Sequence, residues 1–280
     1  MKKRESKKLI FKKYIQPYEK ILKKAKVKLD LKTPVEIKIS HWWYFHYPLK
    51  RDKVTLYCPP YLKEFEPAFL HYLCHAKILE EGWPRVKVQI QLAKTFNKIE
   101  REKIEKLSKK EQRLRLLLWD GRAGDSFFDF YTFRLLAEKV GLNYFKRFVR
   151  MTTNLGTKKL LKGLEEEYKL DNFIFSVYTY CLDWFAMLYV NSQNLDKESY
   201  KKLGKMFREL LKEKTFQEMT FPNIKQRIQR VRNFYKKLSQ KYSNYKELLK
   251  DGKAVQNQLV KYSQLVWRST GLKVKIVGFE

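Results

Sequence analysis

From residue 85 to about residue 265 the chain contains few glycines or prolines, and its apolar residues recur mostly at helical spacing. This pattern restricts the fold more than any other feature, because such long apolar faces must be buried against one another. It predicts roughly five to seven helices, with breaks near Gly121, Gly141, Gly156, Asn172, Asn194, Pro222 and Gly252.

The first sixty residues contain shorter periodic segments. Apolar residues at helical spacing predict a helix over residues 5–28. Alternating apolar and polar residues predict strands over residues 35–39 and 54–58, separated by an aromatic loop from His41 to Pro48.

Pro67 is suited to the first turn of a further helix, which continues from Ala68 to Glu81 and is ended by Gly82-Trp83-Pro84. Residues 272–276 alternate again and predict a final strand. The expected fold class is therefore α+β and mostly α, with a small sheet near the N-terminus packed on a helical core.

The charge balance is strongly basic: 61 lysines and arginines face 30 aspartates and glutamates, a formal net charge of +31. Residues 1–50 and 201–250 each hold 15 basic and 4 acidic residues, so the excess is concentrated near the two ends. Such a surface repels itself unless an anion is nearby. This argues against an ordinary enzyme of neutral surface and favours DNA, RNA or an anionic membrane face as partner.

The chain has three cysteines, and they are too widely spaced to form a CxxC motif: Cys58, Cys74 and Cys181. They exclude a disulfide framework and a zinc ribbon, and indicate a reducing compartment. The N-terminus is basic but has no apolar segment after it, so it is not a secretory signal. We expect a cytoplasmic protein.

The apolar run of residues 173–190 is near the lower length limit for a membrane span. It carries Asp183 at its middle, and a charge at the centre of a bilayer is costly. We therefore expect a helix buried in a soluble core and no membrane span.

All four histidines lie between residues 41 and 75. His71 and His75 are four residues apart in a predicted helix, so both imidazoles lie on one face of it and can reach the same ion. The pair predicts a metal site. The alternative is a pair of structural histidines, each satisfied inside the core by a backbone carbonyl.

The string Leu70-His71-Tyr72-Leu73-Cys74-His75-Ala76 resembles the HExxH helix of zincin metallopeptidases, in particular the form in SprT-like and IrrE-like families. Two predicted strands before it and a helical region after it follow the same order, so the resemblance covers residues 34–135. It implies a zincin-like core over residues 31–195 that can hold zinc. A basic helix (1–30) and a basic helical region (196–280) would flank this core in one compact unit.

The residue after the first histidine departs from the zincin motif. In zincins it is a glutamate, the general base that activates the zinc-bound water. Here Tyr72 occupies this catalytic position. A phenol titrates near pH 10, at about three units above neutrality, and is a poor base. We therefore expect a protein that binds metal but does not hydrolyse peptides.

The resemblance also implies a third ligand from a later helix, within an ExxAD-like string whose nearest counterpart is residues 119–128. Matching Ala123 to the alanine of that motif places Asp120 at the ligand position. Matching Asp125 to its aspartate instead leaves Gly121 there. Alternative ligands are Glu80, Glu81, His41 and His46.

No acidic residue occurs between Met219 and Lys246. Apolar residues from Ile224 to Tyr242 form one helical stripe, and basic residues occupy the other faces. The solvated surface of a lysine-rich protein would also carry glutamates, which this helix lacks. We expect this helix to bind the phosphates of DNA or RNA independently of base sequence. The residues expected to make these contacts are Lys225, Arg227, Arg230, Lys236, Lys237 and Lys241.

Three hypotheses for the function follow. The first is a zincin-like, inactive protein that binds zinc and holds nucleic acid on basic helices. The second is a helical nucleic-acid-binding protein with structural histidines. The third is an active metal-dependent hydrolase in which Asp120 or Asp125 supplies the missing base.

Overall fold

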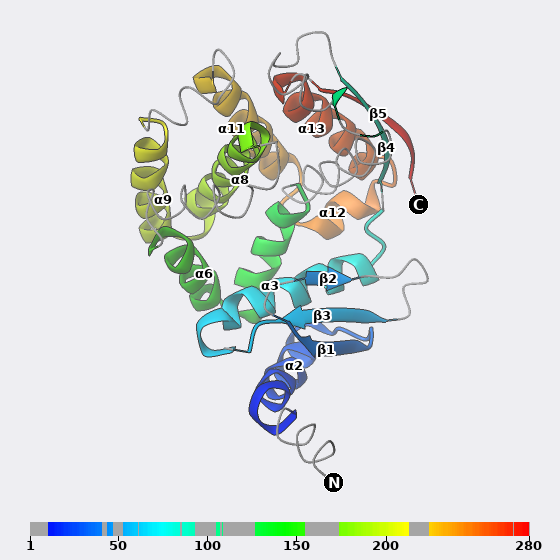
Figure 1. Cartoon of the computed structure of the whole chain (residues 1–280), viewed down its shortest axis with the longest axis vertical. Coiled ribbons are helices and arrows are strands. Elements are labelled where there is room, and N and C mark those ends of the chain that lie inside the picture. Colours follow the sequence, from blue (N-terminus) through cyan, green and yellow to red (C-terminus); the bar gives the residue numbers. More distant parts are fainter. Residues whose placement is uncertain are drawn as a thin grey trace. The chain divides into compact units, whose positions relative to one another are not determined.

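The computed structural model describes residues 11–40, 44–46, 53–60, 62–84, 86–92, 105–106, 108, 127–154, 174–212, 224–270 and 272–279. Contacts divide the chain into two compact units. One comprises Met1–Trp83 with Thr132–Phe148, and the other comprises Pro84–Tyr131 with Val149–Glu280. Most described elements are helices, and the sheets are small (Figure 1). The predicted α+β, mostly α class is confirmed, whereas the predicted domain boundaries stay a prediction.

The first unit contains a three-stranded sheet in the order β1-β3-β2. β1 (Val35–Ile39) runs parallel to β3 (Val54–Cys58), and both strands were expected from their alternation. β2 (Tyr44–His46) lies inside the predicted aromatic loop and pairs antiparallel with β3. The remaining loop residues, 41–43 and 47–50, lie outside the described residues.

Helices accompany this sheet in the first unit. The π-helix η1 (Phe11–Ile15) leads into α2 (Gln16–Leu29), where the sequence predicts a helix. α2 packs on α3 (Leu62–Glu80). The Tyr18 and Phe69 rings meet edge to face at 5.0 Å, and Tyr18 Oη donates a hydrogen bond of 2.5 Å to Pro59 O.

The predicted start of α3 was wrong. Pro67 lies inside α3 and not in its first turn, because the helix already begins at Leu62. A proline inside a helix removes one backbone hydrogen bond. Burial of Phe69, Leu70 and Leu73 favours keeping the helix in spite of that loss. Gly82, with φ of 99°, ends the helix as expected.

The helical residues 127–135 run directly into the π-helix η2 (Leu136–Gly141), which is followed by α6 (Leu142–Asn154). Gly141 has φ of 144° at this junction, so the predicted break there is confirmed. The boundary between the two units falls inside the helical residues 127–135. Residues on either side of it are therefore held by the same helical backbone.

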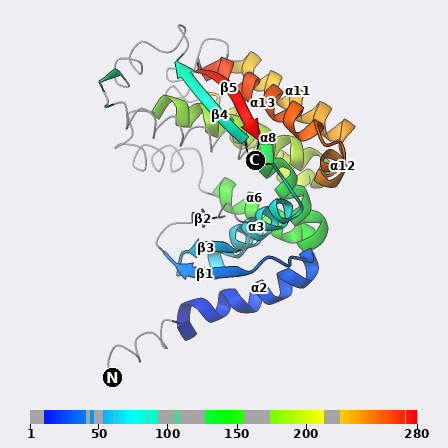
Figure 2. The ribbon, with the colours of Figure 1, turned by 90° about the vertical axis from the view of Figure 1, so that its right-hand side faces the viewer.

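The second unit contains an antiparallel strand pair. β4 (Val86–Leu92) pairs with β5 (Leu272–Phe279), and Figure 2 shows the two side by side. β5 includes the predicted final strand. β4 corrects the expectation of helix from residue 85 onward: Val86, Val88, Ile90 and Leu92 alternate with polar residues, which is strand spacing.

Further helices among the described residues of this unit are α8 (Ile174–Leu195), α9 (Lys197–Leu210), α11 (Ile224–Lys241), α12 (Tyr245–Lys250) and α13 (Ala254–Thr270). The side chain of Asp196 caps α9 and that of Asn244 caps α12. Predicted breaks near Asn194 and Gly252 are confirmed. Those near Gly121, Gly156, Asn172 and Pro222 lie outside the described residues.

α9 and α11 both pack on α8, and aromatic rings fill much of this core. Phe130 stacks on Tyr235 at 4.9 Å, and Asn191 Nδ2 donates a hydrogen bond to Phe130 O. Asp183 is fully buried, as expected for the helix predicted from the apolar run. Among the described helices, none is long and apolar enough to cross a membrane.

Cys58 and Cys74 are buried free thiols. Burial raises the pKa of Cys58 to about 12 and that of Cys74 further in the same direction. Thiolates are the reactive form, so both cysteines act as small apolar core residues. The side chain of Cys181 lies outside the described residues.

Candidate metal centre

His71 and His75 are neighbours on the buried face of α3. Their Nε2 atoms lie 2.9 Å apart, and the two residues are 6% and 8% exposed. The helix places them there because residues four apart stack on one face. The predicted convergence of the two imidazoles is therefore confirmed.

Aromatic rings hold the His71 imidazole in place. Phe133 stacks on it at a centroid distance of 4.3 Å, and Phe148 lies 5.4 Å away. Such packing fixes the ring orientation of a ligand before any ion binds, which favours binding because less conformational freedom is lost.

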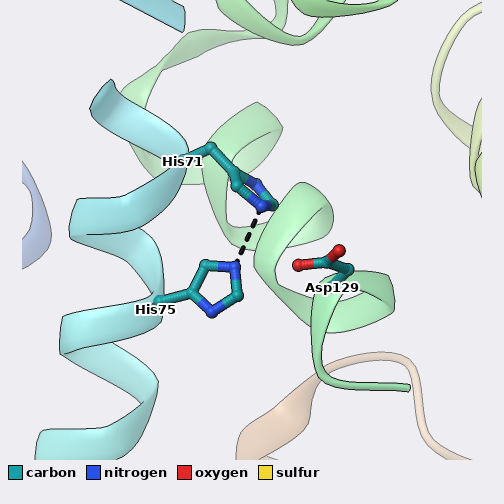
Figure 3. A group of neighbouring side chains, drawn as sticks. All are labelled: His71, His75 and Asp129. Atoms are coloured by element: carbon teal, nitrogen blue, oxygen red, sulfur yellow. Dashed lines mark hydrogen bonds between the residues drawn. The ribbon is translucent and has the colours of Figure 1, made fainter. Parts of the chain in front are cut away.

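Asp129 supplies a third donor. It lies one helical turn before Phe133, the residue that stacks on His71, in the helical residues 127–135. Ligand atoms of His71, His75 and Asp129 all lie within 4.8 Å of one another, and all three residues are buried (Figure 3). Trp184 Nε1 donates a hydrogen bond of 3.1 Å to Asp129 Oδ2.

Two imidazoles and one carboxylate are a donor set suited to zinc, which takes nitrogen and oxygen ligands at about 2.0–2.2 Å. Two nitrogens around a tetrahedral zinc ion stand about 3.3 Å apart by that geometry, a few tenths of an ångström beyond the Nε2–Nε2 separation. Three protein donors leave a fourth position for water. The residues therefore fit the ion that the motif implies.

Sequence reasoning missed Asp129. The ExxAD-like string directed attention to Asp120, which lies outside the described residues together with Asp125. A signal was present, because Asp129 is the only acid in the string FFDFYTF, residues 127–133. An acid within such an apolar helix needs a partner when it is buried.

The alternative metal ligands expected from the sequence either bind another side chain or lie outside the described residues. His41 lies outside the described residues, and so does the side chain of His46. Glu80 and Glu81 both contact Lys77 at the C-terminal end of α3, at 3.1 and 3.0 Å, and are not in the donor group of His71 and His75.

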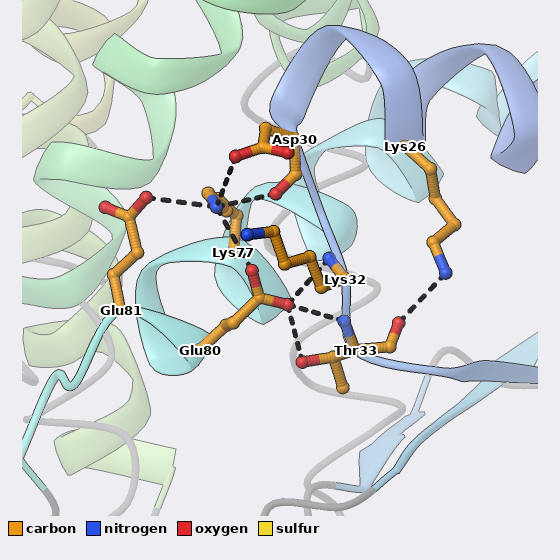
Figure 4. Close-up of polar contacts among 7 residues, drawn as sticks. All are labelled: Lys26, Asp30, Lys32, Thr33, Lys77, Glu80 and Glu81. Carbon is orange, nitrogen blue, oxygen red and sulfur yellow. Dashed lines mark hydrogen bonds and ion pairs between the residues drawn. The ribbon is translucent and has the colours of Figure 1, made fainter.

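Lys77 is the centre of a polar network that joins this end of α3 to the turn after α2 (Figure 4). Its Nζ also donates to Asp30 O at 2.7 Å. Glu80 Oε2 accepts from Lys32 N, Thr33 N and Thr33 Oγ1. Burial alone would lower the pKa of Lys77, but Glu81 and Glu80 outweigh it and raise that pKa.

Tyr72 lies half-buried beside the histidine pair. Its ring centroid is 5.9 Å from that of His71 and 5.7 Å from that of His75. A tyrosine at this position offers a phenol where the zincin motif has a carboxylate base. The arrangement can thus bind and polarise a ligand on a metal, but Tyr72 offers no carboxylate to take a proton from it.

The basic residues predicted to contact nucleic acid are placed as follows. Arg230, Lys236, Lys237 and Lys241 are exposed on α11, and the side chains of Lys225 and Arg227 lie outside the described residues. Within the part of the chain that the structure describes, no carboxylate forms an ion pair with any of these four exposed residues.

Comparisons with protein-family models, curated proteins and solved structures found no match to this chain. The zincin resemblance therefore stays a prediction from the motif of residues 70–76 and from the order of the elements around it.

Proposed function

We propose that this protein binds one zinc ion through His71, His75 and Asp129 as a zincin-like protein without peptidase activity. The observation that carries the proposal is the convergence of three buried donors on one point. A metal cation among these donors would balance the charge of the buried carboxylate and accept lone pairs from both imidazoles.

The burial of all three donors favours a structural role for the metal. Three protein ligands with a fourth position for water are also the coordination of catalytic zinc sites, but the burial of these donors keeps that position away from a substrate. Tyr72 supports the same conclusion, because a zincin-like site without its carboxylate lacks the base that activates water.

Metal analysis of the purified chain after dialysis tests this proposal. Wild-type protein made with zinc should retain a single equivalent, and His71→Ala and Asp129→Asn should lose it. Asp120→Asn is the matched control and should retain the ion. Zinc at about 100 times its dissociation constant should stabilise the wild type by about 2.7 kcal/mol and leave Asp129→Asn unchanged.

If wild-type protein made with zinc retains no metal after dialysis, the result would favour the hypothesis that the histidines are structural. Loss in Asp120→Asn with retention in Asp129→Asn would move the third ligand to the position that the zincin resemblance implies.

We also propose that α11 binds nucleic acid through phosphate contacts. The observation that favours this second function is the exposed set Arg230, Lys236, Lys237 and Lys241, on a helix whose sequence contains no acid. Unpaired cations of this density are suited to neutralising several phosphates at once.

Duplex binding at several salt concentrations tests the second proposal. On a log–log plot the affinity should fall by about 0.9 units per phosphate contact, and Arg230→Ala/Lys237→Ala/Lys241→Ala should flatten the slope by about 2–3 units. The triple change should cost little stability, because surface substitutions usually stay within about 0.5 kcal/mol each. An unchanged slope would place the contact surface elsewhere.

A further inference from the structure

The outermost face of α11 is uncharged. Gln226, Gln229, Asn233 and Gln240 are all exposed, and their spacing of three, four and seven residues places them on one line along the helix. We name these four residues the amide ridge. A helix covered for solubility alone would carry charge at its most exposed positions.

Basic residues flank the amide ridge on both sides. Arg232 and Lys236, four residues apart, form one flank. Arg230, Lys237 and Lys241, spaced by seven and four residues, form the other.

The packing of α11 shows how these flanks are oriented. The Arg232 guanidinium carbon lies 4.6 Å from the centroid of the Tyr189 ring in α8. Phe234 lies one helical turn after Arg230, beside the other flank, and its ring centroid is 5.4 Å from that of Tyr262 in α13. α11 therefore rests on α8 and α13, and the amide ridge is the part farthest from both.

Two members of the amide ridge are already organised. Gln229 Nε2 donates a hydrogen bond of 2.9 Å to Asn233 Oδ1. This bond leaves the Oε1 acceptor of Gln229 and the Nδ2 donor of Asn233 for another partner. Adenine presents the complementary pair in the major groove, an N6 donor beside the N7 acceptor.

We propose that α11 enters the major groove of B-form DNA, with the amide ridge on base edges and the two basic flanks on the two phosphate backbones. This inference rests on the nucleic-acid binding proposed above and adds that the binding is sequence-dependent. The 18 residues of α11 span about 27 Å, and the major groove, about 12 Å wide, admits one helix.

Charge alone would not require this arrangement. A surface that only neutralises phosphates needs lysines and arginines, and amides add nothing to that electrostatic attraction. The inference also separates DNA from RNA, because the major groove of A-form RNA is too deep and narrow for side chains to read.

Selection of the full chain against a library of random short DNA duplexes tests the inference. We expect enrichment of an adenine-containing sequence that binds about tenfold or more tightly than its scrambled duplex, the ratio that a bidentate base contact supplies. The RNA duplex of the same sequence should bind no more tightly than scrambled DNA.

Gln229→Ala/Asn233→Ala should lower affinity for the selected duplex to that for the scrambled one. Its affinity for the scrambled duplex and its salt slope should equal those of the wild type, because no charge is removed. Gln193→Ala, an exposed amide on α8, is the matched control and should keep the preference.

Binding of duplex DNA without enrichment, equal binding of the RNA duplex, or an unchanged preference in the double variant would each overturn the groove-reading inference while leaving phosphate binding intact. Absence of duplex binding by the wild type at about 50 mM salt would instead overturn the underlying proposal, and this inference with it.

Discussion

The indole Nε1 of Trp184 donates a hydrogen bond of 3.1 Å to Oδ2 of Asp129. Both residues belong to the second unit, where this contact joins α8 to the helical turn that carries Asp129. A donor on one carboxylate oxygen fixes the orientation of the group, which is how outer partners tune a metal ligand.

Replacing the indole should therefore weaken metal binding. Trp184→Phe keeps an aromatic ring but removes the donor, and we expect zinc affinity to fall by about 10- to 100-fold. Competition with a chromophoric chelator measures this. Phe207→Leu, which removes a buried ring that stacks on Tyr189, is the control and should leave the affinity unchanged. Equal affinities of wild type and Trp184→Phe would place the carboxylate ligand elsewhere.

Tyr72 should set the level of hydrolysis. Wild-type protein loaded with zinc should not cleave an unfolded, fluorescently labelled protein substrate. Tyr72→Glu restores a base where the zincin motif has one, and general-base catalysis contributes about 10²–10⁴-fold. Any residual metal-dependent hydrolysis should rise by that factor, and Tyr72→Gln, of the same shape without a base, should not change it.

Chelator-sensitive cleavage by the wild type that is lost in His75→Ala would contradict this prediction. It would favour the active-hydrolase hypothesis.

Glu80 should make stability depend on pH. Burial alone would raise the pKa of this carboxyl, but hydrogen bonds from Thr33 and contact with Lys77 outweigh it and hold the pKa below its ordinary value of 4.5. Because the pKa of Glu80 is lower in the folded than in the unfolded chain, its ionised form stabilises the fold at any pH above the unfolded-state pKa. This stabilisation is lost as the pH falls through the lower, folded-state pKa.

Glu80→Gln should thus lower the free energy of unfolding by about 1–3 kcal/mol at neutral pH, because its hydrogen bonds are charge-assisted. The difference from wild type should shrink as the pH falls below 4.5. Urea unfolding over a pH series measures it. Glu198→Gln, which breaks the exposed pair with Lys202, is the control and should cost much less. A difference that does not vary with pH would contradict the role given to Glu80.

Gly204 should resist substitution although it lies inside α9. A Cβ there would meet Tyr189 Cε2 at 3.1 Å, and Tyr189 is held by a hydrogen bond to Tyr200. Alanine gains about 1 kcal/mol of helix propensity, but overpacking costs about 1–3 kcal/mol. We expect Gly204→Ala to be net destabilising by about 1 kcal/mol, measured by thermal unfolding. Gly252→Ala, whose Cβ would meet nothing within 4 Å, should be nearly neutral.

Local periodicity was sufficient for several elements and for part of the site. Strict alternation predicted β1 and β3, and the four-residue spacing of His71 and His75 predicted that their imidazoles share one face. The apolar stripe of α11 likewise predicted its buried face, including Val231 and Tyr235. Each of these depends only on the geometry of one helix or strand.

Pairings between distant segments were not predictable in this way. β4 pairs with β5 although the two strands lie near opposite ends of the second unit's sequence. The sequence of neither strand specifies the other as its partner, because any edge strand of suitable length offers the same backbone donors and acceptors.

The sequence by itself determined that His71 and His75 face the same way, that Tyr72 directly follows the first of them, and that α11 carries no acid. Only the tertiary structure brought Asp129 to the histidine pair and Trp184 to Asp129. The physical reason is that spacing along a helix fixes which side chains share a face. Which other helix covers that face is decided by long-range packing, whose partners no local pattern specifies.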